Sequence, residues 1–179
     1  MVYLFLANGF EEIEALTPLD VLRRAGVQVT TVGVGGDSVL GAHGIRVQAD
    51  IPDTMYRDAA PDMIILPGGM PGSEHLDNSR TVDAALRTAA ANDAYLCAIC
   101  AAPMVLGKRG YLQGKRAVCY PGFEQYLQGA EVSDGRVEID GHVITAKGMG
   151  AALEFGLALV EVLCGKQKAE QIAAAVFAQ

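Results

Sequence analysis

Cys100 is the residue whose surroundings point most directly to chemistry. It follows the apolar run 95–99 and precedes Ala101-Ala102-Pro103, where the proline suits the first turn of a helix. Alanines stand two residues before and after it, as a nucleophile in a sharp strand-to-helix turn requires, because larger side chains would collide. A thiol at a helix start also meets the positive end of the helix dipole, which favours the thiolate. The alternative is a small cysteine buried at the end of a strand.

Three glutamates follow the first apolar run, at the same predicted sheet edge as Cys100. Glu11 and Glu12 suit the first turn of a helix, where acidic side chains complement the helix dipole. Glu14 stands three residues after Glu11 and next to Ile13. If its side chain turns inward, burial raises its pKa, and the carboxyl can then exchange a proton with a bound substrate or a thiol.

A glycine-rich loop, residues 67–72 (PGGMPG), follows another apolar run. Glycines let the backbone approach a ligand closely and can present N–H groups to a developing oxyanion. The loop lacks the lysine of a phosphate-binding loop and the spacing of a dinucleotide fingerprint. A plain tight turn is the alternative.

The remaining cysteines suggest other thiol chemistry. Cys97 and Cys100 form a C-x-x-C pair, but three residues of strand separate their Cα atoms by roughly 10 Å, and a disulfide spans less than about 7 Å. Neither Cys119 nor Cys164 supplies a second ligand pair for zinc, so we expect no metal and a buried, structural Cys97. We expect Cys119 to be a half-buried structural cysteine; the alternative is a thiol that traps an oxidised Cys100.

The three histidines, His43, His75 and His142, are all far from Cys100 in the sequence. None is followed two residues later by glutamate, as a cysteine-hydrolase site would favour. We therefore expect each histidine to lie at the surface or in a turn.

The elements that must position these residues are short apolar runs separated by amphipathic stretches. Apolar and polar residues do not alternate in these runs, so we expect them to be strands of a parallel sheet that is covered on both faces. They span residues 2–7, 27–34, 63–66 and 95–99. Ligands bind at the carboxyl ends of such strands, so the loops that begin at Asn8, Pro67 and Cys100 are the places to search.

Helical spacing predicts helices over residues 11–25, 80–91 and 150–164. The first places Ile13, Leu16, Leu19 (or Asp20) and Leu22 on one stripe, and Pro18 predicts a kink or a restart capped by Thr17. The second buries Val82, Leu86 and Ala89. The third buries Leu153, Leu157, Val160 and Cys164 before a stop at Gly165.

Two hairpins interrupt this rhythm. One joins residues 39–40 to 45–48, and the other joins 136–139 to 142–146 across the turn signal Asp140-Gly141. The architecture expected from these elements is a doubly wound, mostly parallel α/β sheet with small antiparallel hairpin additions.

Composition narrows the class of protein. The chain has 179 residues, 51% hydrophobic and 20% charged, which suits one well-packed domain over residues 1–179. A net charge of −7 argues against a nucleic-acid binder. The six-residue apolar opening is too short for a membrane span, and glutamates follow it where a targeting peptide would be neutral or basic. We expect a cytoplasmic protein with reduced cysteines and no membrane partner.

Together these segments resemble the ThiJ/PfpI superfamily, in particular its parkinsonism-associated deglycase (DJ-one) branch. The segments that carry the likeness run almost from end to end: residues 9–14 (GFEEIE), 18–26 (PLDVLRRAG), 66–69 (LPGG), 98–103 (AICAAP) and 154–165. The resemblance implies a flavodoxin-like sandwich related to the class I glutamine amidotransferases. It also implies that Cys100 is the reactive elbow cysteine, that Glu14 is its protonated partner, and that the Gly69 and Ala101 amides form an oxyanion site.

The sequence departs from some relatives. Peptidase-like members carry histidine directly after the cysteine, where this chain has Ala101, and amidotransferase relatives carry a late His-x-Glu that this chain lacks. Neither a peptidase nor an amidotransferase is therefore expected. The best-known branch members also carry histidine before a proline near the cysteine, where this chain has Tyr120-Pro121.

The resemblance implies a cofactor-independent glyoxalase or deglycase that acts on small reactive aldehydes such as methylglyoxal. The alternative is a redox-sensing or chaperone-like protein of oxidative stress, whose Cys100 is oxidised to sulfinate. A third reading is a plain α/β binding module with an unreactive cysteine.

The resemblance also implies a homodimer built around the first helix. Val21, Leu22 and Ala25, with the basic pair Arg23-Arg24, follow Glu14 on this segment, and one amphipathic face can bury itself against its copy. On the alternative reading the arginines are solvated charges at a helix C-terminus.

Overall fold

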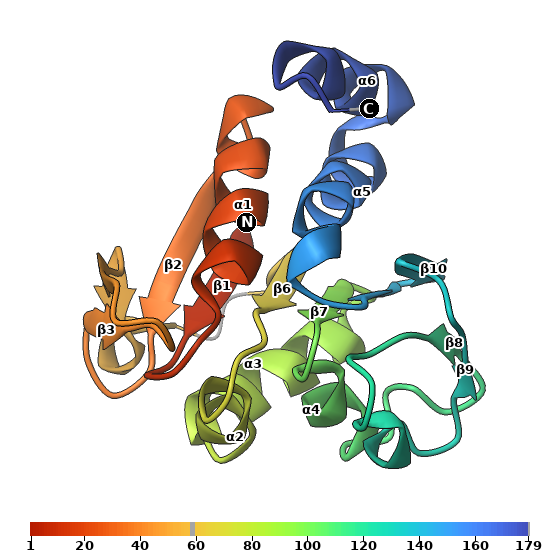
Figure 1. Ribbon diagram of the computed structural model, residues 1–179. Helices are drawn as coiled ribbons and strands as arrows, with labels where there is room; N and C mark the ends of the chain where they lie inside the picture. The colour runs from red at the N-terminus through yellow and green to blue at the C-terminus, as the bar shows by residue number, and fades with distance from the viewer. Residues whose placement is uncertain (58–59, 179) are drawn as a thin grey trace.

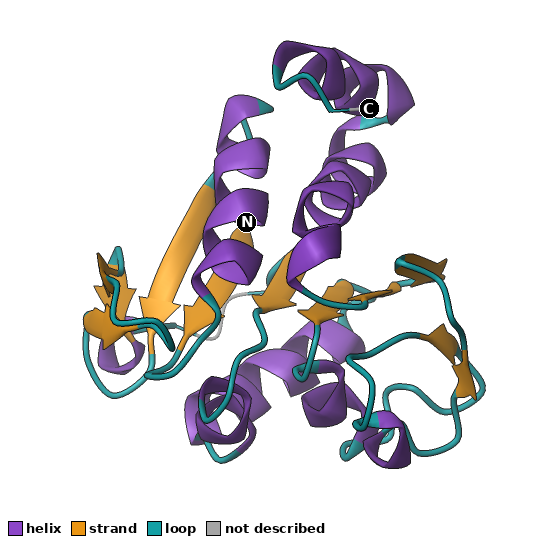
Figure 2. Ribbon diagram, in the orientation of Figure 1, coloured by secondary structure: helices purple, strands orange, loops and turns teal. Residues whose placement is uncertain are grey.

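The computed structural model describes residues 1–57 and 60–178 and is built on a central sheet (Figures 1 and 2). Its seven strands are β1 (Val2–Leu6), β2 (Val29–Gly33), β5 (Ile51–Pro52), β6 (Met63–Leu66), β7 (Tyr95–Ile99), β10 (Val137–Asp140) and β11 (Val143–Ala146). Their order is β10-β11-β7-β6-β1-β2-β5, with all neighbours parallel except the antiparallel pair β10 and β11. Every residue of β1 and β6 is buried, as both-face coverage requires.

Helices cover both faces of the sheet, which confirms the predicted α/β class. The helices α1 (Glu12–Arg24), α5 (Ala152–Cys164) and α6 (Lys166–Ala175) lie on one face. The helices α2 (Gly72–Asp77), α3 (Arg80–Ala91) and α4 (Pro103–Gly107) lie on the other (Figure 1). Smaller elements are β3 (Ser38–Leu40), β4 (Arg46–Gln48), β8 (Arg116–Ala117), β9 (Glu131–Val132), and the 3-10 turns η1 (Asp53–Met55), η2 (Glu124–Tyr126) and η3 (Met149–Ala151).

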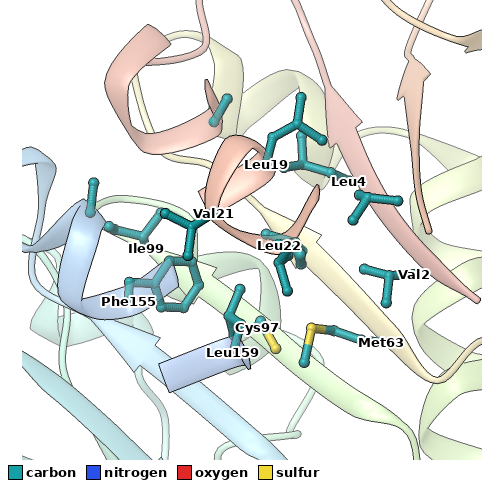
Figure 3. Close-up of a cluster of buried hydrophobic side chains, with 14 of the residues drawn as sticks. Val2, Leu4, Leu19, Val21, Leu22, Met63, Cys97, Ile99, Phe155 and Leu159 are labelled. Atoms are coloured by element: carbon teal, nitrogen blue, oxygen red, sulfur yellow. The ribbon is translucent and has the colours of Figure 1, made fainter. Parts of the chain in front are cut away.

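The core on the α1 side is a continuous cluster of aliphatic side chains around Phe155 (Figure 3). Helices α1 and α5 approach closely because α5 carries Gly156: a Cβ there would lie 3.1 Å from the Pro18 Cα and 3.3 Å from the Val21 Cβ. Val21 is only 2% exposed within this cluster. The prediction that Val21, Leu22 and Ala25 form a dimer face is therefore wrong, because all three are buried inside the chain.

Two details of the predicted helices are also wrong. Helix α1 continues through Pro18, so the predicted restart at Thr17 does not occur. Leu19 and Leu22 are buried as predicted, but the buried face also contains Glu14 and Pro18, and Ile13 is 47% exposed. In α5 the buried residues are Ala152, Phe155, Gly156, Leu159 and Val160, whereas Leu153 and Leu157 are partly covered and Cys164 is exposed. Because α5 packs against α1 as well as α6, its contacts decide which apolar positions face inward.

Other elements agree with the sequence. Helix α3 spans Arg80–Ala91 and buries Val82, Leu86 and Ala89, and Gly165 ends α5 at a φ of 87°. The hairpin of β3 and β4 is present. The second hairpin is present too, but it is not an addition beside the sheet: β11 pairs in parallel with β7 within it. Strand β2 is shorter than predicted, at Val29–Gly33.

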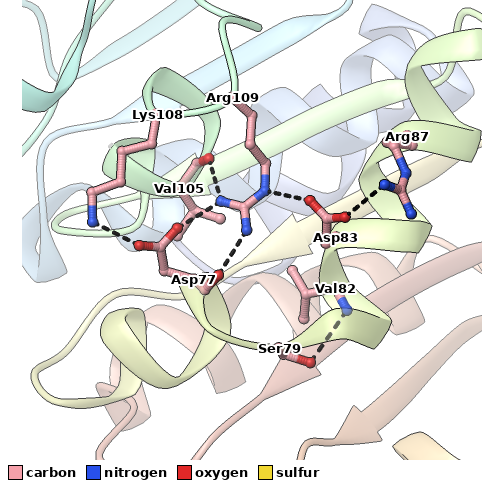
Figure 4. Close-up of polar contacts among 8 residues, drawn as sticks. All are labelled: Asp77, Ser79, Val82, Asp83, Arg87, Val105, Lys108 and Arg109. Carbon is pink, nitrogen blue, oxygen red and sulfur yellow. Dashed lines mark hydrogen bonds and ion pairs between the residues drawn. The ribbon is translucent and has the colours of Figure 1, made fainter.

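A partly buried arginine joins the three helices beneath the glycine-rich loop and Cys100. Arg109, just after α4, donates hydrogen bonds to the Asp77 carboxylate at 2.6 Å, the Asp83 carboxylate at 3.0 Å and the Val105 carbonyl at 2.9 Å (Figure 4). It also donates to the Asp77 carbonyl at 2.7 Å. Because Asp77 ends α2 and Asp83 lies in the first turn of α3, this one side chain joins the end of α2, the start of α3 and the end of α4.

Candidate active site

Cys100 occupies the turn between β7 and α4 in a backbone conformation that is uncommon for any residue other than glycine. Its φ is +66°. Hydrogen bonds from neighbouring segments hold this turn: the Cys100 N–H donates to the Ala146 carbonyl at 2.9 Å, and the Tyr120 N–H donates to the Cys100 carbonyl at 2.8 Å. The cysteine therefore stands at the carboxyl edge of the sheet, as predicted, with its side chain part-buried.

Glu14 reaches this thiol from α1. Its side chain is 1% exposed and shares a hydrogen bond with Cys100, and its carboxyl also accepts the N–H groups of Gly68, at 3.0 Å, and Met149. A Cβ on Gly68 would lie 2.4 Å from the Glu14 Oε2 and 2.6 Å from the Cys100 Cβ. The carboxyl and the thiol can meet only because residue 68 has no side chain.

The amide groups of two further residues approach the sulfur. The N–H groups of Gly69 and Ala101 donate hydrogen bonds to Cys100 and lower its pKa. Gly69 has a φ of +89°, and the Ser73 N–H bonds its carbonyl at 2.9 Å, so the loop presents its N–H to the thiol. The four residues predicted for the site thus converge, and their catalytic roles remain predictions.

Burial dominates the electrostatics. It raises the pKa of Glu14 from 4.5 to about 7, with a further rise from the charge of Glu11. Burial is also the main cause that raises the pKa of Cys100 to about 12, followed by the charge of Glu14. The helix α4 has only five residues, and burial is the largest effect on the Cys100 pKa, so the contribution expected from the helix dipole is outweighed.

The two groups hold one proton between them over a wide pH range, so they titrate as a pair. With the proton on sulfur, the negative charge rests on Glu14 and opposes ionisation of the thiol. With the proton on Glu14, that charge is gone and the carboxyl O–H donates to sulfur, which favours the thiolate. The pair can therefore present an ionised nucleophile next to a proton donor.

The histidines lie elsewhere, as predicted. His43 contacts the Glu12 carboxylate at 3.0 Å, His75 bonds the Asn8 carbonyl at 2.8 Å, and the ring of His142 packs on Tyr95. Among the described residues, no hydrogen bond or ion pair joins a histidine to Cys100. His43 also gathers with Glu11 and Glu12 in a group whose ligand atoms lie within 4.8 Å of one another, as a cation would need.

The other cysteines have separate surroundings. Cys97 is fully buried in the core on the α1 side, as predicted, and Cys164 is exposed. Cys119 is buried rather than half-buried, at 3% exposure. It belongs to the second hydrophobic core, which lies between the sheet and helices α2, α3 and α4. Cys100 packs against the opposite core, and this separation favours the structural reading of Cys119.

Sequence reasoning missed the loop of residues 147–151, which supplies the Met149 N–H to Glu14. The signal was available: Gly148 and Gly150 follow β11, and its four residues are all buried. The same combination of a buried strand and glycines singled out the loop at Pro67.

A mostly parallel α/β sheet whose carboxyl edge holds a strained cysteine beside a buried carboxyl defines a flavodoxin-like protein with a thiol-centred site. The chain belongs to the DJ-1/PfpI family, whose family model matches residues 1–162. This confirms the resemblance drawn from the sequence.

Two individual DJ-1 proteins are similar to this chain over nearly its whole length. The chain is 39% identical over 174 residues to protein dj-1beta of Drosophila melanogaster, covering 94% of this chain and 91% of that protein. Toxoplasma gondii DJ-1, solved in an oxidised form, superposes with a TM-score of 0.94 at 38% identity, over 98% of this chain and 97% of that one.

Two other relatives bear on function and length. A Caenorhabditis elegans relative, 35% identical over 164 residues (90% of this chain, 87% of that protein), is named glutathione-independent glyoxalase DJR-1.2. DJ-1 homolog B of Arabidopsis thaliana is 40% identical over 170 residues, 93% of this chain, but the chain spans only 39% of that relative's length. It spans 44% of the length of DJ-1 homolog A. Within the described residues, no helix has the length and apolar character to cross a membrane.

Proposed function

We propose that this protein is a glyoxalase that needs no glutathione and converts 2-oxoaldehydes such as methylglyoxal into 2-hydroxy acids. The observation that carries the proposal is the Cys100–Glu14 hydrogen bond, with the Gly69 and Ala101 amides at the same sulfur. The name of the Caenorhabditis relative supports the reaction class. The deglycase activity expected from the sequence begins with the same thiol addition and is proposed as a side reaction.

The proposed reaction begins with addition of the Cys100 thiolate to the aldehyde carbon. The S–C bond forms as the carbonyl π bond breaks, and the oxyanion is held by the N–H groups of Gly69 and Ala101 until it takes a proton, giving a hemithioacetal. These donors are backbone groups fixed by the loop and the turn, so they need little rearrangement as charge develops.

Glu14 then moves a proton between the two substrate carbons. The carboxylate removes the proton from the former aldehyde carbon to give an enediol, and the carboxylic acid returns a proton to the neighbouring carbon. The result is a thioester of the 2-hydroxy acid. Water cleaves the S–C bond, which releases the acid and restores the thiol. One carbon is oxidised while its neighbour is reduced, so the balance requires no external electron carrier and no metal.

The test is lactate formation from methylglyoxal with no glutathione present. Cys100→Ser should abolish it, and Glu14→Gln should slow it at least a hundredfold, in line with the loss of a positioned acid–base group. Cys164→Ser is the matched control, because Cys164 is exposed and far from the site. Lactate formation by Cys100→Ser at the wild-type rate would overturn the proposal.

A second candidate function is redox sensing through Cys100. The observation that favours it is the same pair of amides with a protonatable Glu14, which would stabilise a sulfinate oxyanion as well as an alkoxide. Mass spectrometry after mild peroxide should find two oxygens on Cys100 before any on the buried Cys97 and Cys119. Oxidation of those two residues first would contradict it.

We also propose a homodimer that uses the exposed side of α1. Ile13 is joined by Ile45 and Met149 around a hollow of about 250 Å³ that Glu11, Glu12 and His43 complete. These exposed apolar side chains replace Val21 as the proposed contact. Light scattering should give twice the 18.8 kDa chain mass, and Ile13→Asp should halve it. A wild-type mass of one chain at micromolar concentration would contradict the dimer.

A further inference from the structure

Tyr120 brings an aromatic ring to the mouth of the Cys100 site. Its N–H donates to the Cys100 carbonyl at 2.8 Å, which fixes its backbone to the strained turn. A point one bond from the Gly148 Cα, where a Cβ would stand, lies 3.4 Å from the Tyr120 Cδ2 and 3.9 Å from the Glu14 Oε1. The ring and the carboxyl therefore flank one small space that residue 148 leaves empty.

The ring is half-exposed, with 51% of Tyr120 open to solvent. An exposed ring face next to a buried acid gives a small molecule an apolar surface on one side and a proton donor on the other. Gly148 keeps this space open although its backbone does not require glycine, because its φ of 165° is extended.

We propose that Tyr120 and Gly148 set the substrate preference of the site, with the Tyr120 ring receiving the group on the second carbon of a 2-oxoaldehyde. This inference rests on the proposed glyoxalase function and names its substrate class: 2-oxoaldehydes with an apolar or aromatic substituent, in preference to glyoxal, which carries only hydrogen there. Tyr120 is a specificity-determining residue, and Gly148 leaves room for the substituent.

The reasoning follows from where the reacting atoms must lie. The aldehyde carbon is held at the Cys100 sulfur, and its neighbouring carbon lies within reach of Glu14 for the proton transfer. A substituent on that neighbouring carbon then extends past Glu14 toward the space beside Gly148, where the Tyr120 ring is the apolar surface. Covering one methyl group is worth about a fourfold change in kcat/KM if the methyl is fully removed from water.

The experiment compares kcat/KM for glyoxal, methylglyoxal and phenylglyoxal across matched variants. Tyr120→Ala should lower the methylglyoxal-to-glyoxal ratio about fourfold and the phenylglyoxal-to-glyoxal ratio further, because a phenyl group covers more area. Tyr120→Phe should keep both ratios, since the ring remains. Gly148→Ala should fill the space without backbone strain and lower the phenylglyoxal ratio most. Phe177→Ala, a change at a ring 91% exposed near the C-terminus, is the control.

A second measurement does not depend on turnover. The alkylation rate of Cys100 by 2-iodo-N-phenylacetamide, divided by its rate with iodoacetamide, should fall in Tyr120→Ala and stay in Tyr120→Phe, as measured by peptide mapping. If the wild-type protein converts none of the aldehydes, the glyoxalase proposal fails, and this alkylation ratio alone decides the role of Tyr120. Ratios in Tyr120→Ala equal to those of wild type, in either measurement, would overturn the inference.

Discussion

Replacing Glu14 by glutamine tests where the shared proton of the site resides. Glutamine keeps the size of the side chain and can still meet the N–H of Gly68 through its carbonyl, but it cannot take a proton from Cys100. Burial, the largest cause of the raised Cys100 pKa, stays in place. The charge of Glu14, the next cause, is removed, so the two effects of the carboxyl can be separated.

The expected magnitude follows from the pKa values. On the hypothesis that Glu14 keeps the shared proton, the pair loses its first proton from sulfur, near the pKa of about 7 given by the carboxyl. At about pH 7.5 roughly three quarters of the Cys100 thiol is then ionised. In Glu14→Gln the charge of residue 14 is gone, but the burial that raises the Cys100 pKa above its ordinary value of 9.0 remains. We therefore expect at most about 3% of the thiol to be ionised at about pH 7.5. A more basic thiolate is a better nucleophile, which returns part of this loss. The net slowing of alkylation is about threefold for a pKa of 9 and about tenfold for one near 10.

The assay is iodoacetamide alkylation of Cys100 between about pH 5 and pH 10, followed by mass spectrometry of the peptide. The wild-type rate should rise through about pH 7 and then level off, whereas the variant should rise only at higher pH. Glu170→Gln, at an exposed position of α6, should follow the wild-type profile.

The opposite result would refute the reasoning. If the proton stayed on sulfur and the charge on Glu14, glutamine would remove a repulsive charge, and Glu14→Gln would react faster than wild type at about pH 7.5. A wild-type profile with no rise near pH 7 would also contradict the shared proton.

Other predictions concern stability. Because the pKa of Glu14 is raised in the folded state, its contribution to the free energy of unfolding is complete below pH 4.5 and is lost as the pH rises through about 7. Urea unfolding should therefore find Glu14→Gln more stable than wild type by up to about 3 kcal/mol near pH 8.5, and equally stable near about pH 4. Arg109→Ala should lower the free energy of unfolding by about 3 kcal/mol, since it removes the hydrogen bonds that join Asp77 to Asp83 and leaves Asp77, among the described residues, paired with Lys108 alone. A loss under about 1 kcal/mol would contradict the role of Arg109 in joining the three helices. Val21→Asp should unfold the chain, because it places a charge against Phe155 in the core, and circular dichroism should show the loss of helix (Figure 3). A variant that stays folded but becomes monomeric would instead support Val21 as a dimer contact.

The parts of the fold that could be predicted are those with dense local signals. Continuous apolar runs predicted β1, β6 and β7, and the stripe of Val82, Leu86 and Ala89 predicted the bounds of α3. The rotation of α1 could not be predicted, because Ile13 and Leu16 are as apolar as the residues that are buried. The contact with Gly156 of α5 and the demand that Glu14 face the sheet edge decide it, and both are tertiary.

The residues of the site could be predicted from the sequence, but their electrostatic surroundings could not. Cys100, Glu14, Gly69 and Ala101 were predicted as site residues because each follows the end of a buried strand or lies in a segment that resembles the family. The effect of burial on the thiol pKa could not be predicted, because a local rule about helix starts says nothing of how deeply the turn is buried. Burial depends on α1 and on the loop of Met149, which are distant in sequence.

The hydrogen bond between Gly68 and Glu14 joins residues 54 apart in the chain, and the turn at Cys100 is closed by Ala146 and Tyr120. Contacts of such long range form only after most of the chain has collapsed, because each requires the closure of a large loop. An unfolded or half-folded chain therefore has four ordinary thiols, and only the native protein has one whose proton is shared with a carboxyl. Pulsed alkylation of Cys100 during refolding would thus time the last stage of assembly, with no added dye or label.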